Sequence, residues 1–180
     1  MGTGAFASVR AERNLNIQTT GDSGAYLSLN VESSDYATQS GQTLSVEFDE
    51  LNANADTAIY NVFSIENTGN NDVQVQLFPG GGSVSSELPD GPLAVYFSEN
   101  ELNGPAVANL TPFANSPSPS YIDDFGGPTV VESGTKIYVH IIVYLNSELE
   151  ELGSGVSTDV SDVPDNLGIY ADATPEEDFS

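Results

Sequence analysis

Short runs in which apolar and polar residues alternate recur along the sequence, and turn-forming residues separate one run from the next. Residues 42–49 are typical, because Leu44, Val46 and Phe48 occupy every second position. Side chains of a β-strand point alternately to its two faces, so this period predicts a half-buried strand. No stretch combines the length and the 3.6-residue period of a persuasive helix.

The strongest run is residues 135–145, where apolar side chains occupy both faces. This pattern is expected of a central strand, or of one whose outer face is covered by a neighbouring subunit. Residues 57–67 and 73–78 flank a turn rich in Asn and Gly, which predicts a hairpin. On the first of these strands, alternation places Ile59, Phe63 and Ile65 on one face and Tyr60 and Val62 on the other. The remaining expected strands are 5–11, 14–19, 25–32, 42–49, 93–97, 129–131 and 167–171.

About eight or nine short strands separated by turns predict an all-β fold, a single jelly-roll-like antiparallel β-sandwich. The exception is the loop at 99–128, which is rich in Pro, Asn and Ser. Loops of that length are usually functional or mobile. Four apolar residues could pack this loop on the sandwich or dock it on a neighbouring molecule: Leu110, Phe113, Tyr121 and Phe125.

Acidic residues outnumber basic ones by 27 to 3, which gives a formal net charge of -24. Such a chain is a poor partner for nucleic acid, because phosphate contacts require Lys and Arg. The charge also points to molar salt, in which the Debye length falls to about 3 Å and neighbouring carboxylates barely repel each other. We therefore expect a halophilic, haloarchaeal source; a merely acidic surface is the alternative.

The chain contains no cysteine, so it has no disulfide framework, and this neither supports nor opposes secretion. It has no run of about 20 apolar residues that would span a membrane. The first five residues, MGTGA, resemble what remains after removal of an apolar leader that ends in small residues. We therefore expect a mature, secreted form; an intact cytosolic start is the alternative.

The sequence offers little for catalysis. His140 is the only histidine, and it lies in the middle of the run at 135–145. No HExxH or GxSxG motif is present, and a single imidazole leaves little room for a zinc site or a catalytic triad. We therefore expect that the protein is not an enzyme, that it has no cofactor, and that His140 is a partly buried side chain with satisfied hydrogen bonds.

Two groups of acids in loops could hold calcium, because carboxylate oxygens are its usual ligands. Neither group matches the EF-hand spacing, so calcium is a secondary expectation. The groups are Asp123 with Asp124, and Asp159 with Asp162 and Asp165.

The only N-glycosylation sequon begins at Asn109 and lies in the long loop, where a used sequon should be. Pro112 directly follows the sequon and disfavours its use. Asn109 is therefore a candidate glycan carrier if the protein is secreted.

The opening block of residues 2–29, GTGAFASVRAERNLNIQTTGDSGAYLSL, resembles the start of mature haloarchaeal secreted proteins related to the TasA/camelysin family. The similarity continues through VFSIENTG at 62–69 and GIYADA at 168–173. The resemblance implies a jelly-roll sandwich. It also implies assembly, because members that form bacterial biofilm fibres and archaeal bundling pili insert an N-terminal strand into the next subunit's sheet. Camelysin is described as a metalloprotease, but this sequence offers no ligand set for that activity.

Charge distribution is compatible with such a donor strand. Residues 1–13 hold two arginines and one glutamate, a charge of +1, whereas residues 14–180 hold one lysine and 26 acids, a charge of -25. A slightly positive strand that enters an acidic groove is electrostatically favoured. Head-to-tail donation need not close, so it yields a fibre. The alternative is that residues 5–11 pair within their own domain or fray. The expected donor residues are Ala5, Phe6, Ala7, Val9 and Ala11, with Arg10 and Arg13 meeting acids of the acceptor.

The expected organisation is a donor strand at 1–13, a sandwich at 14–172 and an acidic tail at 173–180. The expected function is a structural subunit of an extracellular filament, a pilus or biofilm-matrix fibre that polymerises with copies of itself. The mature form would have no membrane or nucleic-acid partner. The alternative is a monomeric cell-surface binding module that recognises a cation, a glycan or another protein through the 99–128 loop.

Overall fold

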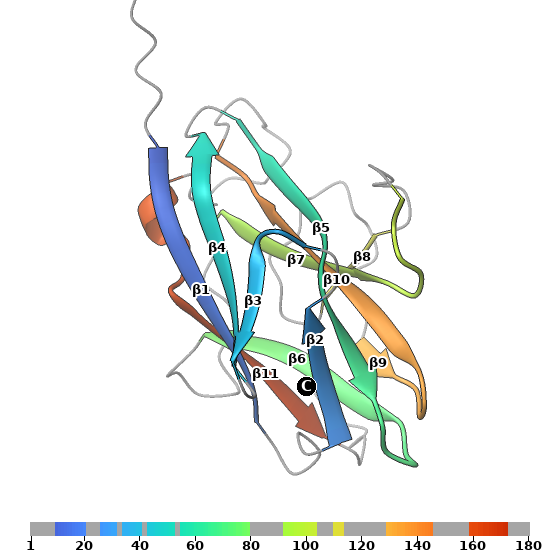
Figure 1. Ribbon diagram of the computed structural model, residues 1–180. Helices are drawn as coiled ribbons and strands as arrows, with labels where there is room; N and C mark the ends of the chain where they lie inside the picture. Colours follow the sequence, from blue (N-terminus) through green and yellow to red (C-terminus); the bar gives the residue numbers. More distant parts are fainter. Residues whose placement is uncertain are drawn as a thin grey trace, which may run out of the picture.

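The computed structural model describes residues 10–20, 26–31, 34–40, 43–52, 55–79, 92–103, 110–113, 129–145 and 159–172. Within these ranges, eleven strands form two sheets that enclose an apolar core (Figure 1). A short 3-10 helix, η4 (Val160–Asp162), precedes the last strand. The predicted all-β sandwich is therefore confirmed, while its finer jelly-roll connectivity stays a prediction.

The larger sheet brings the first and last strands of the sandwich together. β1 (Arg10–Thr20) pairs with β11 (Asn166–Asp172) in parallel and with β4 (Thr43–Asn52) in antiparallel orientation. The parallel pair is an exception to the expected antiparallel order. Parallel neighbours need a long connection, and here nearly the whole chain separates the two strands. The strand order is β3 (Ala37–Ser40), β4, β1, β11, β6 (Val73–Pro79) and β9 (Thr129–Val131).

The smaller sheet is centred on β10 (Lys136–Val143), which pairs with β5 (Thr57–Asn67) on one side and with β7 (Leu93–Ser98) on the other. The predicted central strand is therefore confirmed. Its alternate residues from Ile137 to Leu145 are buried in the core between the sheets. The strand order is β2 (Leu27–Val31), β5, β10, β7 and β8 (Thr111–Pro112).

Alternate residues of both sheets fill the core. Each large apolar side chain buried there contributes roughly 1.5–3 kcal/mol relative to its exposed state. Phe113, from the long loop, is one of them, and Leu110 packs in a second cluster outside the sheet. These two residues thus pack on their own sandwich, whereas Tyr121 and Phe125 lie outside the described residues. The largest fully buried core side chains are Phe48, Phe63, Phe113, Ile17, Leu44, Ile65, Leu77, Ile141, Leu167 and Ile169.

The predicted hairpin of β5 and β6 is wrong, because the two strands lie in different sheets. Residues 68–72 instead carry the chain from one sheet to the other, and the buried side chain of Asn67 fixes this corner. Its Nδ2 donates to the carbonyl oxygens of Asn71 (2.8 Å) and Val131 (2.9 Å). Its Oδ1 accepts from the N–H of Gly69 (2.9 Å). The turn rich in Asn and Gly therefore marks a corner of the sandwich.

Strand β5 does not alternate regularly, because Asn61 has a φ of 50°. Val139 lies opposite Phe63 and Ile141 lies opposite Ile59, so residues 60–62 face a single residue of β10. This bulge places both Val62 and Phe63 in the core. The prediction that these two side chains face opposite sides is therefore wrong.

Candidate functional site

The N-terminal strand is the first candidate site. Arg10, Ala11 and Arg13 belong to β1 and pair with β4 of the same chain. β1 continues past residue 13, so the predicted division between 1–13 and 14–172 does not coincide with the end of an element. The other expected donor residues, Ala5, Phe6, Ala7 and Val9, lie outside the described residues.

β1 has strand neighbours on both sides over only part of its length. β4 runs beside it from Arg10 to Ile17, whereas β11 runs beside it from Asn16 to Thr20. Among the described strands, residues 10–15 therefore have a neighbour on one side only. Backbone N–H and C=O groups on such a side can pair with a strand of another molecule.

The edge strands of the two sheets offer less room for an incoming strand than β1 does. Nε2 of Gln39 in β3 donates to the carbonyl oxygen of Leu29 in β2 (2.8 Å), so one edge strand is tied to the other. At the far edges, β8 and β9 have only two and three residues. Short edge strands limit unwanted pairing, so these edges offer little length to an incoming strand.

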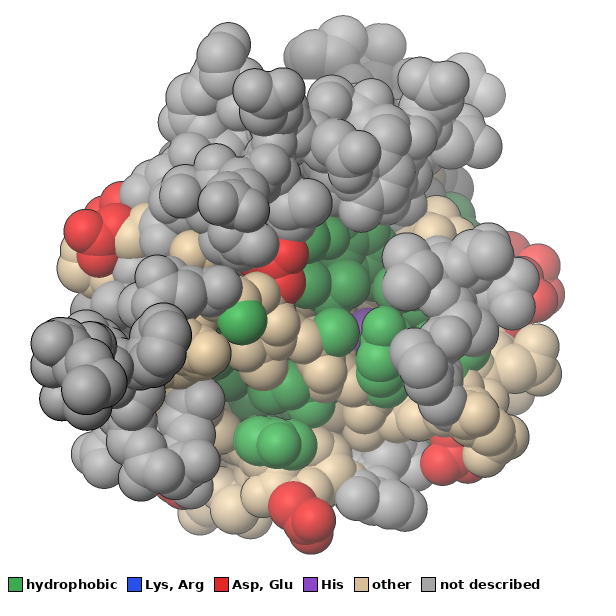
Figure 2. Space-filling view, turned by 90° about the horizontal axis from the view of Figure 1, so that it is seen from above, with side chains coloured by type: hydrophobic (Ala, Val, Ile, Leu, Met, Phe, Trp, Pro, Cys, Tyr) green, Lys and Arg blue, Asp and Glu red, His purple; other side chains and the backbone are tan. Residues whose placement is uncertain are grey.

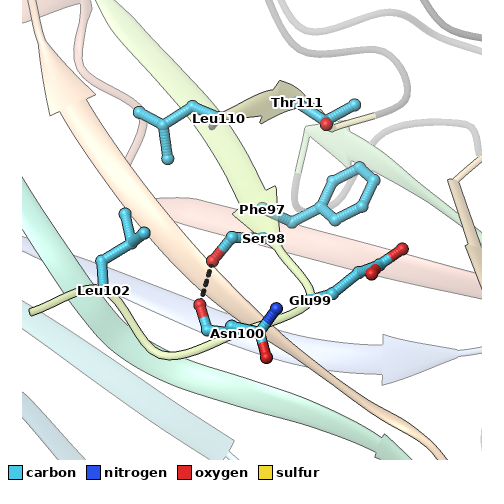
Figure 3. A pocket seen from close by; sticks show the side chains of 7 residues that line it. All are labelled: Phe97, Ser98, Glu99, Asn100, Leu102, Leu110 and Thr111. Atoms are coloured by element: carbon cyan, nitrogen blue, oxygen red, sulfur yellow. Dashed lines mark hydrogen bonds between the residues drawn. The ribbon is translucent and has the colours of Figure 1, made fainter. Parts of the chain in front are cut away.

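A pocket at the end of β7, where the long loop begins, is the second candidate site. Its volume is ≈ 460 Å³. Figure 3 shows Leu102 and Leu110 on one side of Ser98, with Phe97 and Glu99 on the other. Apolar walls beside a carboxylate and an amide suit a ligand that has both an apolar face and hydrogen-bonding groups. The lining residues are Phe97, Ser98, Glu99, Asn100, Leu102, Leu110 and Thr111.

Behind this pocket, His140 takes part in a relay of hydrogen bonds. The N–H of Asn61 donates to Nδ1 of His140 (2.9 Å), and Nε2 lies 2.8 Å from Oγ of Ser98. Oγ of Ser98 donates to the carbonyl oxygen of Asn100 (2.6 Å). Since Nδ1 is an acceptor, the proton of the neutral ring is on Nε2. Burial lowers the pKa of His140 to about 4. The prediction of satisfied hydrogen bonds for His140 is confirmed, and the side chain is fully rather than partly buried.

The Ser98–His140 pair has the spacing of a nucleophile and a base, but its hydrogen bonds run the other way. A general base must accept the serine proton, whereas Nε2 donates to Ser98 and Ser98 donates to a backbone carbonyl. The partner of Nδ1 is a backbone N–H rather than a carboxylate that would orient a catalytic imidazole. This relay therefore stabilises the rim of the pocket and does not activate Ser98.

The outer face of the smaller sheet carries a second apolar cluster beside the relay. The hydroxyls of Tyr96 and Tyr144 lie 3.0 Å apart within it. Figure 2 shows apolar side chains gathered near the middle of the view, with acidic side chains mostly toward the rim. Leu102 and Leu110 from the long loop cover part of this face. The cluster contains Ala94, Tyr96, Leu110, Ile142 and Tyr144, with Tyr60 and Leu102 packed against it.

The predicted calcium sites have no built counterpart in the part of the chain that the structure describes. There, no group of three or more His, Cys, Asp or Glu side chains is placed to hold a metal ion. Oδ1 of Asp159 instead accepts from the N–H and from Oγ of Ser161 (both 2.8 Å), which caps η4. Asp123, Asp124 and the sequon residue Asn109 lie outside the described residues, and calcium binding stays a prediction.

Comparison with known proteins assigns no family. A scan against models of protein families found no match to the chain, and searches of curated proteins and of solved structures found no similar protein. In the described ranges, no helix is long and apolar enough to cross a lipid bilayer. The functional argument therefore rests on the residues themselves and on the short motifs of the TasA/camelysin resemblance.

Proposed function

We propose that the protein is a structural subunit of an extracellular filament, whose copies join through the N-terminal strand. The one-sided pairing of residues 10–15 in β1 carries this proposal, because the open side of this stretch can pair with a strand of another copy. Arg10 lies opposite Asn52, the last residue of β4, so the chain enters the sandwich at an end of the sheet. A segment attached at that position can reach a second molecule without crossing its own core.

The pairing of β1 with β4 within one chain limits which residues can act as the donor. Arg10, Ala11 and Arg13 already pair with β4, and releasing them would cost about 0.5–1.5 kcal/mol for each hydrogen bond lost. Donation by the preceding residues, 1–9, leaves this pairing intact. We therefore assign the donor to residues 1–9, with Ala5, Phe6, Ala7 and Val9 as its apolar and small side chains.

The charge distribution along the chain also favours donation by the N-terminal segment. Residues 14–180 carry a charge of -25, so the sandwich as a whole is strongly acidic, while residues 1–9 contain no acid. The two arginines that follow the donor, Arg10 and Arg13, lie at the joint between copies. Molar salt screens this attraction, so apolar burial and strand pairing must supply most of the affinity.

Electron microscopy in molar salt tests the proposal. Full-length protein should form fibres. Deletion of residues 2–9 should abolish fibres but leave a folded sandwich with a cooperative unfolding transition, because the described strand β1 stays complete. Full-length protein that remains an 18.9 kDa monomer at high concentration would contradict the proposal.

The pocket at the end of β7 favours a second candidate function, a binding module that uses the 99–128 loop. Glu99, Asn100 and Thr111 place polar groups at a hollow of ≈ 460 Å³. A fragment screen by NMR should give shifts confined to the amides of residues 97–100 and 110–111. Thr111→Trp, which fills the hollow, should remove these shifts without affecting fibres. Shifts that survive this substitution would place the ligand elsewhere.

A further inference from the structure

Tyr26 is a positioned but exposed aromatic side chain at the corner between the two sheets. It is 53% exposed, the highest value among the large hydrophobic side chains described. Its carbonyl oxygen accepts from the N–H and from Oγ1 of Thr68 (both 2.9 Å). A Cβ at Gly69 would lie 3.1 Å from Cβ and 3.2 Å from Cγ of Tyr26, so glycine allows the aromatic side chain to lie against the loop. The loop therefore fixes the base of this side chain, from which the exposed ring can contact a ligand.

The loop beneath this ring is held on both sides. Oγ of Ser133 donates to the carbonyl oxygen of Gly69 (2.8 Å), and the N–H of Ser133 donates to Oδ1 of Asp72 (2.9 Å). The buried Asn67 side chain binds the same loop from within. Asn70 and Asn71 are exposed on this fixed backbone. Their amide groups offer donors and acceptors at a defined place.

Tyr26 and the two asparagines border a hollow of ≈ 110 Å³, which Gly69 and Val73 complete. No charged side chain is among its lining residues. Pockets that enclose a drug-sized ligand measure about 300–1,000 Å³, so this hollow fits one ring of a larger molecule.

We propose that Tyr26, Asn70 and Asn71 form a binding subsite for one neutral sugar ring. A pyranose has an apolar C–H face, which suits the flat face of Tyr26, and a rim of hydroxyls, which suits the asparagine amides. The net charge of -24 disfavours an anion. A cation would be held best by a carboxylate, but none lines the hollow, and Oδ1 of the nearby Asp72 accepts from Ser133. The subsite contains no residue of the donor segment, and its proposal does not rest on filament formation.

Saturation-transfer NMR in molar salt tests the subsite. The probes are the methyl glycosides of glucose, galactose, mannose and N-acetylglucosamine. At least one should bind full-length protein, and Tyr26→Ala should weaken its binding by about tenfold. Tyr36→Ala is the matched control, because Tyr36 is 48% exposed but is not among the residues that line this hollow, and it should leave binding unchanged.

Two further variants test the placement of Tyr26 and the role of an exposed amide. Gly69→Ala should weaken sugar binding because its methyl group displaces Tyr26, and Asn70→Ala should weaken it by removing an exposed amide. All three subsite variants should form fibres like the parent protein. Failure of every glycoside to bind, equal binding by Tyr26→Ala, or Tyr26-dependent binding of tetramethylammonium in place of the sugars would overturn the inference.

Discussion

Nε2 of His140 lies 2.8 Å from Oγ of Ser98, and this contact links the middle of the smaller sheet to the rim of the pocket beyond β7. The imidazole is fully buried and accepts a backbone N–H at Nδ1, so its neutral form is the one that fits. Burial lowers the pKa of His140 from 6.5 to about 4. The fold therefore has a built-in dependence on pH.

The sign of this dependence follows from proton binding. Between pH 6.5 and about 4 the unfolded chain binds a proton at His140 and the folded chain does not. The contribution of His140 to the free energy of unfolding is complete above pH 6.5. It should decline by roughly 3 kcal/mol as the pH falls to about 4. Denaturant unfolding at constant molar salt, repeated at several pH values between 7 and about 4, measures this decline in the free energy of unfolding.

His140→Gln is the control, because many carboxylates titrate near the lower end of the same range. The variant should be less stable than the parent at pH 7, and the gap between the two should narrow as the pH falls. Parallel curves for the two proteins would show that His140 is not the source of the dependence.

Asn61 combines a strained backbone with two hydrogen bonds to the start of the long loop. Its φ is 50°; its Nδ2 donates to the carbonyl oxygen of Leu102 (2.8 Å), and its Oδ1 accepts from the N–H of Leu102 (3.0 Å). Asn61→Gly and Asn61→Ala both remove these bonds, which should cost about 2 kcal/mol. Alanine, unlike glycine, also disfavours the positive φ. The Asn61→Ala variant should therefore be less stable than the Asn61→Gly variant by about 1 kcal/mol. Equal unfolding midpoints for the two variants would contradict this account.

The Asn67 corner should be among the most sensitive polar positions of the sandwich. Asn67→Ala removes three hydrogen bonds, one of them fully buried, which should lower the free energy of unfolding by about 3 kcal/mol. Asn70→Ala changes an exposed side chain of the same loop and should stay within about 0.5 kcal/mol of the parent. Denaturant unfolding compares the two, and similar losses would show that the corner does not depend on Asn67.

Alternation predicts individual strands better than it predicts their neighbours. The expected bounds 57–67 and 129–131 coincide with β5 and β9. Alternation does not predict β3 or β8. The sequence of β3, ATQS, contains one apolar residue, and β8 has only two residues. The two-residue alternation of apolar and polar residues does not indicate which strands are neighbours in a sheet. An Asn- and Gly-rich turn fits a hairpin and a corner equally well, and only the buried bonds of Asn67 distinguish them.

The candidate sites depend even more on distant contacts. Ser98 and His140 are 42 residues apart in the chain, and nothing local to either residue signals the hydrogen bond. The bulge at Asn61 reflects its bonds to Leu102 and His140, which lie in other segments. Tyr26 and the loop at 67–72 likewise meet only after the sheets form. By contrast, the charge difference between the N-terminal segment and the rest of the chain is visible in the sequence alone.

Phe6 is the largest side chain of the assigned donor segment. Phe6→Asp should stop or slow fibre formation, because a carboxylate would be buried at the joint without a partner. Phe6→Leu preserves apolar volume and should form fibres. Electron micrographs of both variants in molar salt provide the comparison, and normal fibres from Phe6→Asp would show that Phe6 is not buried at the joint.

A mixing experiment tests most directly whether one copy donates its N-terminal segment to another. The variant that lacks residues 2–9 has no donor but keeps the acceptor sandwich, so it should bind the fibre end that presents a free donor strand and stop further addition there. Mean fibre length in electron micrographs should therefore fall steadily as the fraction of this variant in the mixture rises. Fibres whose length is independent of the variant would contradict donation between copies.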